Sequence, residues 1–145
     1  MVPKTSTLHV LVLSTLAMLL ATVTANAQPE NPTASTTSAT MGKQSFRSYC
    51  ASCHGTEGRG DGSVAEYLKV PPADLTTISQ RNSGEFPFEQ VYQAIDGRTP
   101  KRSHGSRDMP VWGDAFKMTR DNPDEEGVKK KISELVHFLE SIQQD

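Results

Sequence analysis

The stretch Cys50-Ala51-Ser52-Cys53-His54 is the most informative part of this 145-residue chain. Two cysteines separated by two residues, with a histidine directly after the second, are typical of the attachment site of a c-type haem. The spacing suits that chemistry, because two thiols one helical turn apart can each form a thioether with one vinyl group on the same porphyrin edge. The histidine is then carried under the ring, where its imidazole can bind iron. The motif therefore predicts one covalent haem c.

Other uses of a Cys-x-x-Cys pair fit the chain less well. A thioredoxin-like dithiol belongs to a βαβ pattern, and no strand-rich run precedes Cys50. A structural zinc site needs four ligands, but the chain has two cysteines, with His54, His104 and His137 as further donors. A disulfide over two intervening residues would restrain little. The adjacent histidine and the export signal described next favour haem attachment.

Residues 1–27 have the pattern of a secretory signal peptide. Lys4 supplies a positive charge, residues 10–20 are mostly apolar, and Ala25-Asn26-Ala27 offers small residues for a cleavage site. The apolar stretch is short and rich in Thr and Ser for a membrane span, which leaves an uncleaved N-terminal anchor as the alternative. Export fits the haem motif, since exported cysteines meet an oxidising environment. We therefore expect a periplasmic protein with no membrane span in its mature form.

The rest of the chain is predicted to be a leader and one domain. Residues 28–40, rich in Pro, Ser and Thr, are typical of a flexible leader, and residues 41–145 have the length of one small domain. Loss of Lys4 with the signal changes the formal net charge from −2 to −3. This near balance argues against a nucleic-acid partner. Hydrophobic residues make up 35% of the chain, so a buried haem would complete a thin core.

Every periodic segment of the domain predicts a helix, and no strand-like alternation is present, so an all-α fold is expected. The first helix should run from about Met41 through the haem motif, with Thr40 as its N-cap. One face of it holds, at helical spacing, Gly42, Phe46, Tyr49, Cys50 and Cys53. The glycine-rich stretch 55–62 lacks the Gly-Lys-Ser/Thr end of a phosphate loop, and its glycines should allow a tight turn beside the ring.

Further helices are expected to begin near Ser63, Thr77, Phe86-Pro87 and Asn122. Ser63-Val-Ala-Glu66 has the pattern of a capping box, and the prolines at 71 and 72 should end that helix and lead into extended backbone to Leu75. Gly97 should end the third helix. The last helix should start at Asn122-Pro123-Asp124-Glu125, where a cap, a proline and first-turn acids coincide. Its apolar positions are Val128, Ile132, Leu135, Leu139 and Ile142.

A haem held by one histidine needs a second axial ligand, and the downstream candidates are His104, Met109, Met118 and His137. His137 falls between the inward positions of the last helix and is expected at the surface. Met118 is expected in the core. Met109 differs because Pro110 disfavours helical backbone at the residue before it, within a non-periodic strap at 98–113. His54 and Met109 are therefore the expected iron ligands, with His104 as a bis-histidine alternative.

The sequence resembles the class I monohaem c-type cytochromes of the bacterial periplasm over nearly all of residues 41–145. The resemblance rests on Gly42, Phe46, Cys50-Ala-Ser-Cys53-His54-Gly55, Pro-Pro-Ala-Asp-Leu at 71–75, Ile95-Asp-Gly-Arg98, Met109-Pro-Val-Trp112-Gly113 and Leu135-x-x-Phe138-Leu139. It implies a small cytochrome c fold, with short helices and loops wrapped around the haem. The first and last helices should cross near Gly42, with Phe46 stacked on Phe138.

The resemblance also implies contacts around the haem. A carbonyl near Pro71 or Pro72 should accept the Nδ1 proton of His54 and fix its tautomer. Arg98 and Trp112 are candidates for contacts with the haem propionates.

A six-coordinate iron leaves no open position for a substrate, so an electron carrier is favoured over an enzyme. One alternative is the haem subunit of a periplasmic dehydrogenase or oxidase complex. Another is a ligand-binding or sensor protein with a labile sixth ligand, which the lack of an acid–base set near the strap disfavours. Redox proteins are the expected partners of this monomer or subunit. The basic strap, with Arg98, Lys101, Arg102 and Arg107, suggests an acidic docking face on the partner.

Overall fold

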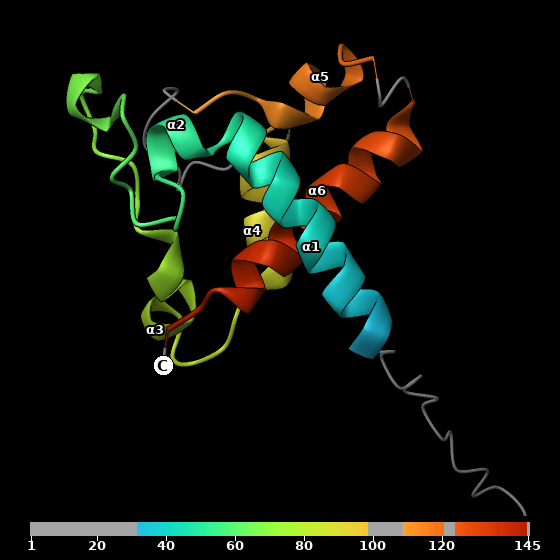
Figure 1. The fold of residues 1–145 in the computed structure, drawn as a ribbon, viewed down its shortest axis with the longest axis horizontal. Coiled ribbons are helices and arrows are strands. Elements are labelled where there is room, and N and C mark those ends of the chain that lie inside the picture. The colour runs from blue at the N-terminus through green and yellow to red at the C-terminus, as the bar shows by residue number, and fades with distance from the viewer. Residues whose placement is uncertain (1–31, 99–108, 121–123, 145) are drawn as a thin grey trace, which may run out of the picture.

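The computed structural model describes residues 32–98, 109–120 and 124–144. These residues form helices and loops without a strand, which confirms the all-α prediction. Two long helices cross, α1 (Pro32–Tyr49) and α6 (Glu125–Ser141), and the shorter helices lie around this pair (Figure 1). None of the described helices is long and apolar enough to cross a membrane. The expected signal peptide, residues 1–27, lies outside the described residues.

The crossing of α1 and α6 depends on Gly42. A Cβ atom at this position would overlap the main-chain carbonyl oxygen of Glu134 and lie 2.9 Å from the Cβ of Phe138. Next to this contact the rings of Phe46 and Phe138 have their centroids 5.1 Å apart, at an interplanar angle of 51°. The predicted crossing is therefore confirmed, although the two rings are tilted rather than stacked.

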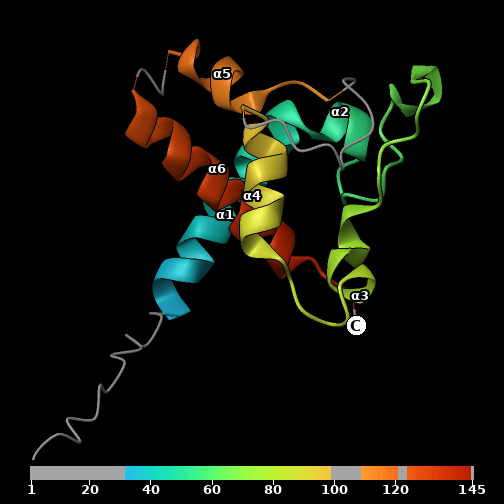
Figure 2. The same cartoon turned by 180° about the vertical axis from the view of Figure 1, so that it is seen from behind.

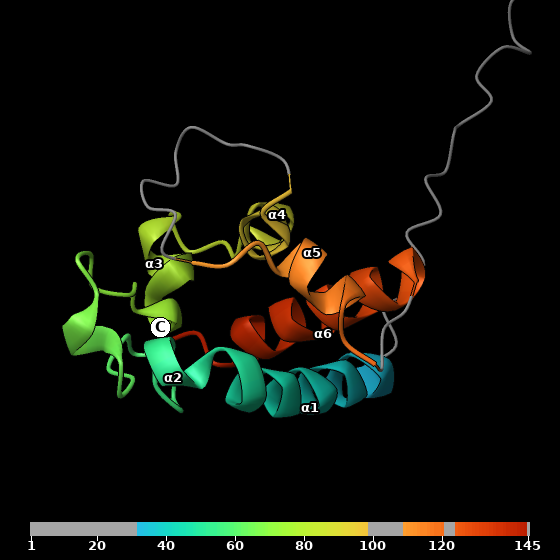
Figure 3. The ribbon, with the colours of Figure 1, turned by 90° about the horizontal axis from the view of Figure 1, so that it is seen from above.

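The core is built mainly on α6, which lies between α1 on one side and α4 (Phe88–Asp96) and α5 (Trp112–Lys117) on the other (Figure 3). The side chains of Phe46, Ile95 and Phe116 are buried against it. The buried residues of α6 itself are Val128, Ile132, Leu135, Val136, Phe138 and Leu139. The periodicity predicted four of these six and, in addition, Ile142, which is half-buried. Contacts on both sides explain why the buried face is wider than one stripe.

The first helix differs from its prediction at both ends. It begins at Pro32 rather than near Met41, so residues 32–40 of the expected flexible leader are helical. Proline is tolerated in a first helical turn, where its missing N–H costs nothing. Thr40 is no N-cap, since its hydroxyl donates to the carbonyl oxygen of Thr36 at 2.9 Å inside the helix. The haem motif lies in a separate turn, α2 (Ala51–His54), after a break at Cys50.

The segment after the glycine-rich stretch is less helical than expected. It holds one 3-10 turn, η1 (Ala65–Tyr67), whose N-cap Val64 receives no side-chain cap bond, so the predicted capping box is wrong. The amide of Val64 donates instead to the carbonyl oxygen of Ser52 at 3.0 Å. This segment is therefore held by the haem motif rather than by its own cap.

The remaining elements follow their predictions closely (Figure 2). Extended backbone leads into η2 (Leu75–Thr77) and α3 (Ile78–Arg81). Helix α4 ends at Gly97, whose φ of 67° is the left-handed conformation that glycine adopts readily. The N-cap of α6 is Asp124, which accepts the amide of Gly127 at 2.7 Å. The expected cap Asn122 and Pro123 lie outside the described residues.

Replacement of Gly42 by alanine should weaken the fold. The added methyl group must push α1 away from the Glu134 carbonyl oxygen, and overpacking of this kind costs about 1–3 kcal/mol. The neighbouring substitution Lys43→Ala, at an exposed position of the same helix, should change stability by less than about 0.5 kcal/mol. Thermal unfolding of both variants checks this, and an unchanged midpoint for Gly42→Ala would show that the crossing tolerates a wider spacing.

Candidate functional site

Helix α2 places the two thiols and the imidazole of the motif on one turn. The carbonyl oxygen of Cys50 accepts the amides of Cys53 at 3.1 Å and His54 at 2.9 Å. Both cysteines are free thiols and are half-buried. Burial raises the pKa of the Cys50 thiol to about 12, with a smaller contribution from Cys53. Cys50 is thus a neutral thiol, and Cys53 lies one turn from it, at the end of α1.

The imidazole of His54 is held by a main-chain carbonyl of the expected segment. Its Nδ1 lies 3.2 Å from the carbonyl oxygen of Ala73, the residue directly after Pro72, rather than from that of Pro71 or Pro72 itself. Burial lowers the pKa of His54, and the bond to Ala73 partly offsets this. A neutral imidazole whose Nδ1 donates to a carbonyl has Nε2 free, which is the arrangement of a histidine that binds a metal.

The glycine-rich stretch connects this histidine to its carbonyl partner. The amides of Gly60 and Gly62 donate to the carbonyl oxygens of His54 at 2.8 Å and Cys53 at 3.2 Å, which completes the bonding at the end of α2. The amide of Leu75 donates to the carbonyl oxygen of Gly58 at 2.7 Å. A Cβ on Gly60, whose φ is 80°, would overlap the carbonyl oxygen of Pro72. The glycines therefore permit a close approach of backbone to backbone.

The C-terminal residues hold the same carbonyl segment from its other end. The side chain of Gln143 accepts the amide of Ser79 at 2.9 Å and donates to the carbonyl oxygens of Leu75 at 2.8 Å and Leu139 at 2.7 Å. The amide of Gln144 donates to the carbonyl oxygen of Thr76 at 2.8 Å. Sequence reasoning missed this contact, because nothing in a terminal Gln-Gln pair indicates where the chain end docks.

Of the four candidates for a second axial ligand, Met109 lies on non-helical backbone just before α5, with 39% of its surface exposed. Met118 is 84% exposed, so the prediction of a core residue is wrong; α5 is too short to bury more than Gly113 and Phe116. His137 is half-buried rather than a free surface residue: its ring centroid lies 4.9 Å from that of Phe88. His104 lies outside the described residues.

Arg98 and Trp112, the candidates for propionate contacts, both contact other side chains of the protein. Arg98 pairs with Asp96, NH2 to Oδ1 at 2.7 Å, and with Glu125, NH1 to Oε1 at 2.7 Å. These carboxylates raise the pKa of Arg98 further above its usual value. The Trp112 ring stacks on Phe116 at 5.2 Å between centroids and lies edge-on to Tyr49 at 5.9 Å. Contacts of either side chain with propionates remain predictions.

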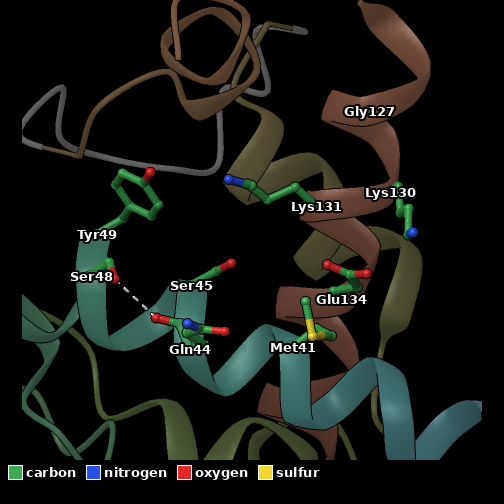
Figure 4. Close-up of a pocket in the computed structure, with 9 residues that line it drawn as sticks. All are labelled: Met41, Gln44, Ser45, Ser48, Tyr49, Gly127, Lys130, Lys131 and Glu134. Carbon is green, nitrogen blue, oxygen red and sulfur yellow. Dashed lines mark hydrogen bonds between the residues drawn. The ribbon is translucent and has the colours of Figure 1, made fainter. Parts of the chain in front are cut away.

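A groove lies between α1 and α6 (Figure 4). Its lining comes from the two helices and is mostly polar; it consists of Met41, Gln44, Ser45, Ser48, Tyr49, Gly127, Lys130, Lys131 and Glu134. Lys131 reaches across it, with Nζ 5.3 Å from the centre of the Tyr49 ring. None of the expected haem ligands lines this groove.

The residues around α2 fit a covalent haem c. They offer two thiols on one turn and a histidine whose Nδ1 is already bound. Nearby segments carry large apolar side chains that the protein leaves exposed, among them Tyr67, Val70, Met109 and Val111. Within the described ranges no three His, Cys, Asp or Glu side chains are grouped to hold a metal ion.

An all-α domain in which the first and last helices cross and a Cys-x-x-Cys-His turn follows the first helix is typical of proteins that attach haem covalently. Residues 39–143, most of the chain, match the family model of cytochrome c. The chain therefore belongs to the cytochrome c family, whose members transfer electrons through haem and are typically carriers rather than enzymes. No curated protein and no solved structure matches it.

The substitution Gly60→Ala should raise the reduction potential of the holoprotein. The methyl group would displace the Pro72 carbonyl and with it the Ala73 carbonyl that receives the His54 proton. Loss of that bond makes the imidazole a weaker donor, which favours reduced iron. Gly84→Ala is the matched control, because Gly84 also has a positive φ, 92°, but no atom lies within 4 Å of its Cβ position. Redox titration of both variants decides; equal potentials would contradict the prediction.

Proposed function

We propose that this protein is a periplasmic electron carrier with one haem c attached through Cys50 and Cys53 and ligated axially by His54 and Met109. The observation that carries the proposal is the bond between His54 Nδ1 and the Ala73 carbonyl oxygen at 3.2 Å. It orients the imidazole beside two thiols on the same turn. When bound, the haem supplies an iron that changes its oxidation state by one electron.

Two of the alternatives to Met109 as second ligand are engaged or placed differently. The ring of His137 packs on Phe88, and its Nδ1 lies 3.4 Å from the Glu140 carboxylate. Met118 follows α5 and points its side chain to solvent. Met109 lies in a segment without helical bonds, two residues before Val111, whose backbone is extended. Such a segment can present a thioether to iron.

Coordination of the iron by both His54 and Met109 favours an electron carrier over an enzyme. With both positions taken, no site remains for a substrate, and a thioether ligand raises the reduction potential. The carbonyl of Ala73 keeps the imidazole in one orientation in both oxidation states. Little rearrangement then accompanies electron transfer, which suits a protein that exchanges electrons with periplasmic partners.

The substitution Met109→Ala should open one coordination position while the thioethers keep the haem attached. The spectrum should shift toward high spin, the reduced protein should bind carbon monoxide, and the potential should fall because the thioether favours reduced iron. Met118→Ala, at an exposed position, should leave the spectrum unchanged. It should change the free energy of unfolding by less than about 0.5 kcal/mol. A low-spin spectrum in Met109→Ala together with its loss in His104→Ala would assign the ligand to His104 instead.

We further propose that the redox partner presents an acidic face to the strap around Lys101, Arg102 and Arg107. Arg98 contributes less than its charge suggests, since Asp96 and Glu125 neutralise it. The rate of electron exchange with the partner should fall as salt rises, because exposed charges are screened beyond about 10 Å at 0.1 M. Stopped-flow measurement across ionic strengths tests this, and a rate independent of salt would contradict it.

A further inference from the structure

Arg98 is the centre of an ion-pair cluster that joins three helices. Its Nε donates to Asp96 Oδ1 at 2.8 Å, at the end of α4, and its NH1 donates to Glu125 Oε2 at 2.9 Å, at the start of α6. Lys117, at the end of α5, reaches the same carboxylate, with Nζ 2.8 Å from Oε2. Asp96 is buried, with 9% of its surface exposed, and its carboxylate faces the guanidinium of Arg98.

Two glycines bring the segment after Met109 against this cluster. A Cβ on Gly113 would overlap Arg98 Nε and Asp96 Oδ1, so the ion pair lies directly on the backbone of α5. A Cβ on Gly97 would lie 3.2 Å from the Cα of Val111. The backbone at Gly97 therefore packs on Val111, and the Arg98 side chain packs on the backbone at Gly113. Met109 is two residues from Val111.

We propose that Arg98 is a positioning residue: its ion pairs with Asp96 and Glu125 clamp the backbone after Met109 and limit how readily the thioether leaves iron. Arg98 touches no reacting atom and acts through the segment 111–113. The inference rests on the proposed ligation by Met109. A planar guanidinium suits this role, because it binds two carboxylates at once in fixed directions, whereas an ammonium group cannot.

The test is the binding of imidazole to the oxidised holoprotein, followed by absorbance. In the wild type, imidazole must displace the sixth ligand. Arg98→Ala leaves Asp96 without its partner and should bind imidazole about tenfold more tightly, the size of a typical coupling between two sites. Arg98→Lys should fall between the two, because it keeps the charge without the fork. Gly113→Ala, which displaces the ion pair from the backbone, should resemble Arg98→Ala.

A control is needed to show that a loss of stability alone does not increase the affinity for imidazole. Val136→Ala, in the core of α6, is the matched control: it lowers the unfolding midpoint but should leave imidazole affinity at the wild-type value. Equal affinity in wild type and Arg98→Ala, or an equal increase in Val136→Ala, overturns the clamp. If Arg98→Ala yields no holoprotein, Arg98→Lys and Gly113→Ala carry the same test.

Met109→Ala separates failure of the clamp from failure of the proposed ligation. If it binds imidazole strongly while the Arg98 and Gly113 variants behave as wild type, Met109 is the ligand and only the clamp is wrong. If Met109→Ala keeps the wild-type affinity, Met109 is not the ligand, and the proposed ligation and the clamp both fail.

Discussion

The close approach of α1 and α6 at Gly42 is the contact on which the other parts of the structure depend. It lets Phe46 and Phe138 meet and leaves the opposite side of α6 for α4 and α5. From this crossing both helices continue to the site. The end of α1 leads directly into the haem motif, and the end of α6 carries Gln143 to the segment that accepts the His54 proton. The close contact that Gly42 permits therefore links the packing of the core to the position of the site.

The two sides of the site are held by different kinds of interaction. On the side of His54, main-chain hydrogen bonds of the glycine-rich stretch and the amide side chain of Gln143 position one carbonyl group. In the region of the proposed ligand Met109, Arg98 forms ion pairs with Asp96 and Glu125. Main-chain bonds between uncharged groups respond little to salt, whereas ion pairs with exposed members do. Salt should therefore affect these ion pairs more than the hydrogen bonds around His54.

Predictions from the sequence were most accurate where the signal is local. The spacing of apolar residues in α6 predicted four of its buried positions, and Gly97 predicted the end of α4. They failed where a distant segment intervenes. The capping box at Ser63 does not form, and the Val64 amide bonds to Ser52 of the haem motif; Met118 is exposed because α5 ends before it. A motif indicates which partners a residue can bind, but the segments that pack against it in the tertiary structure determine which partner it binds.

The sequence by itself determined the cofactor chemistry and the helical class of this protein. Cys50, Cys53 and His54 lie within one turn, so their spacing alone brings their side chains together. The tertiary structure alone decided which carbonyl holds His54 and that the distant carboxylate of Glu125 holds Arg98. Ala73 lies 19 residues from His54 and Glu125 lies 27 residues from Arg98. Partners this far apart are brought together by close packing against the backbone at positions such as Gly60 and Gly113, which no periodicity in the sequence indicates.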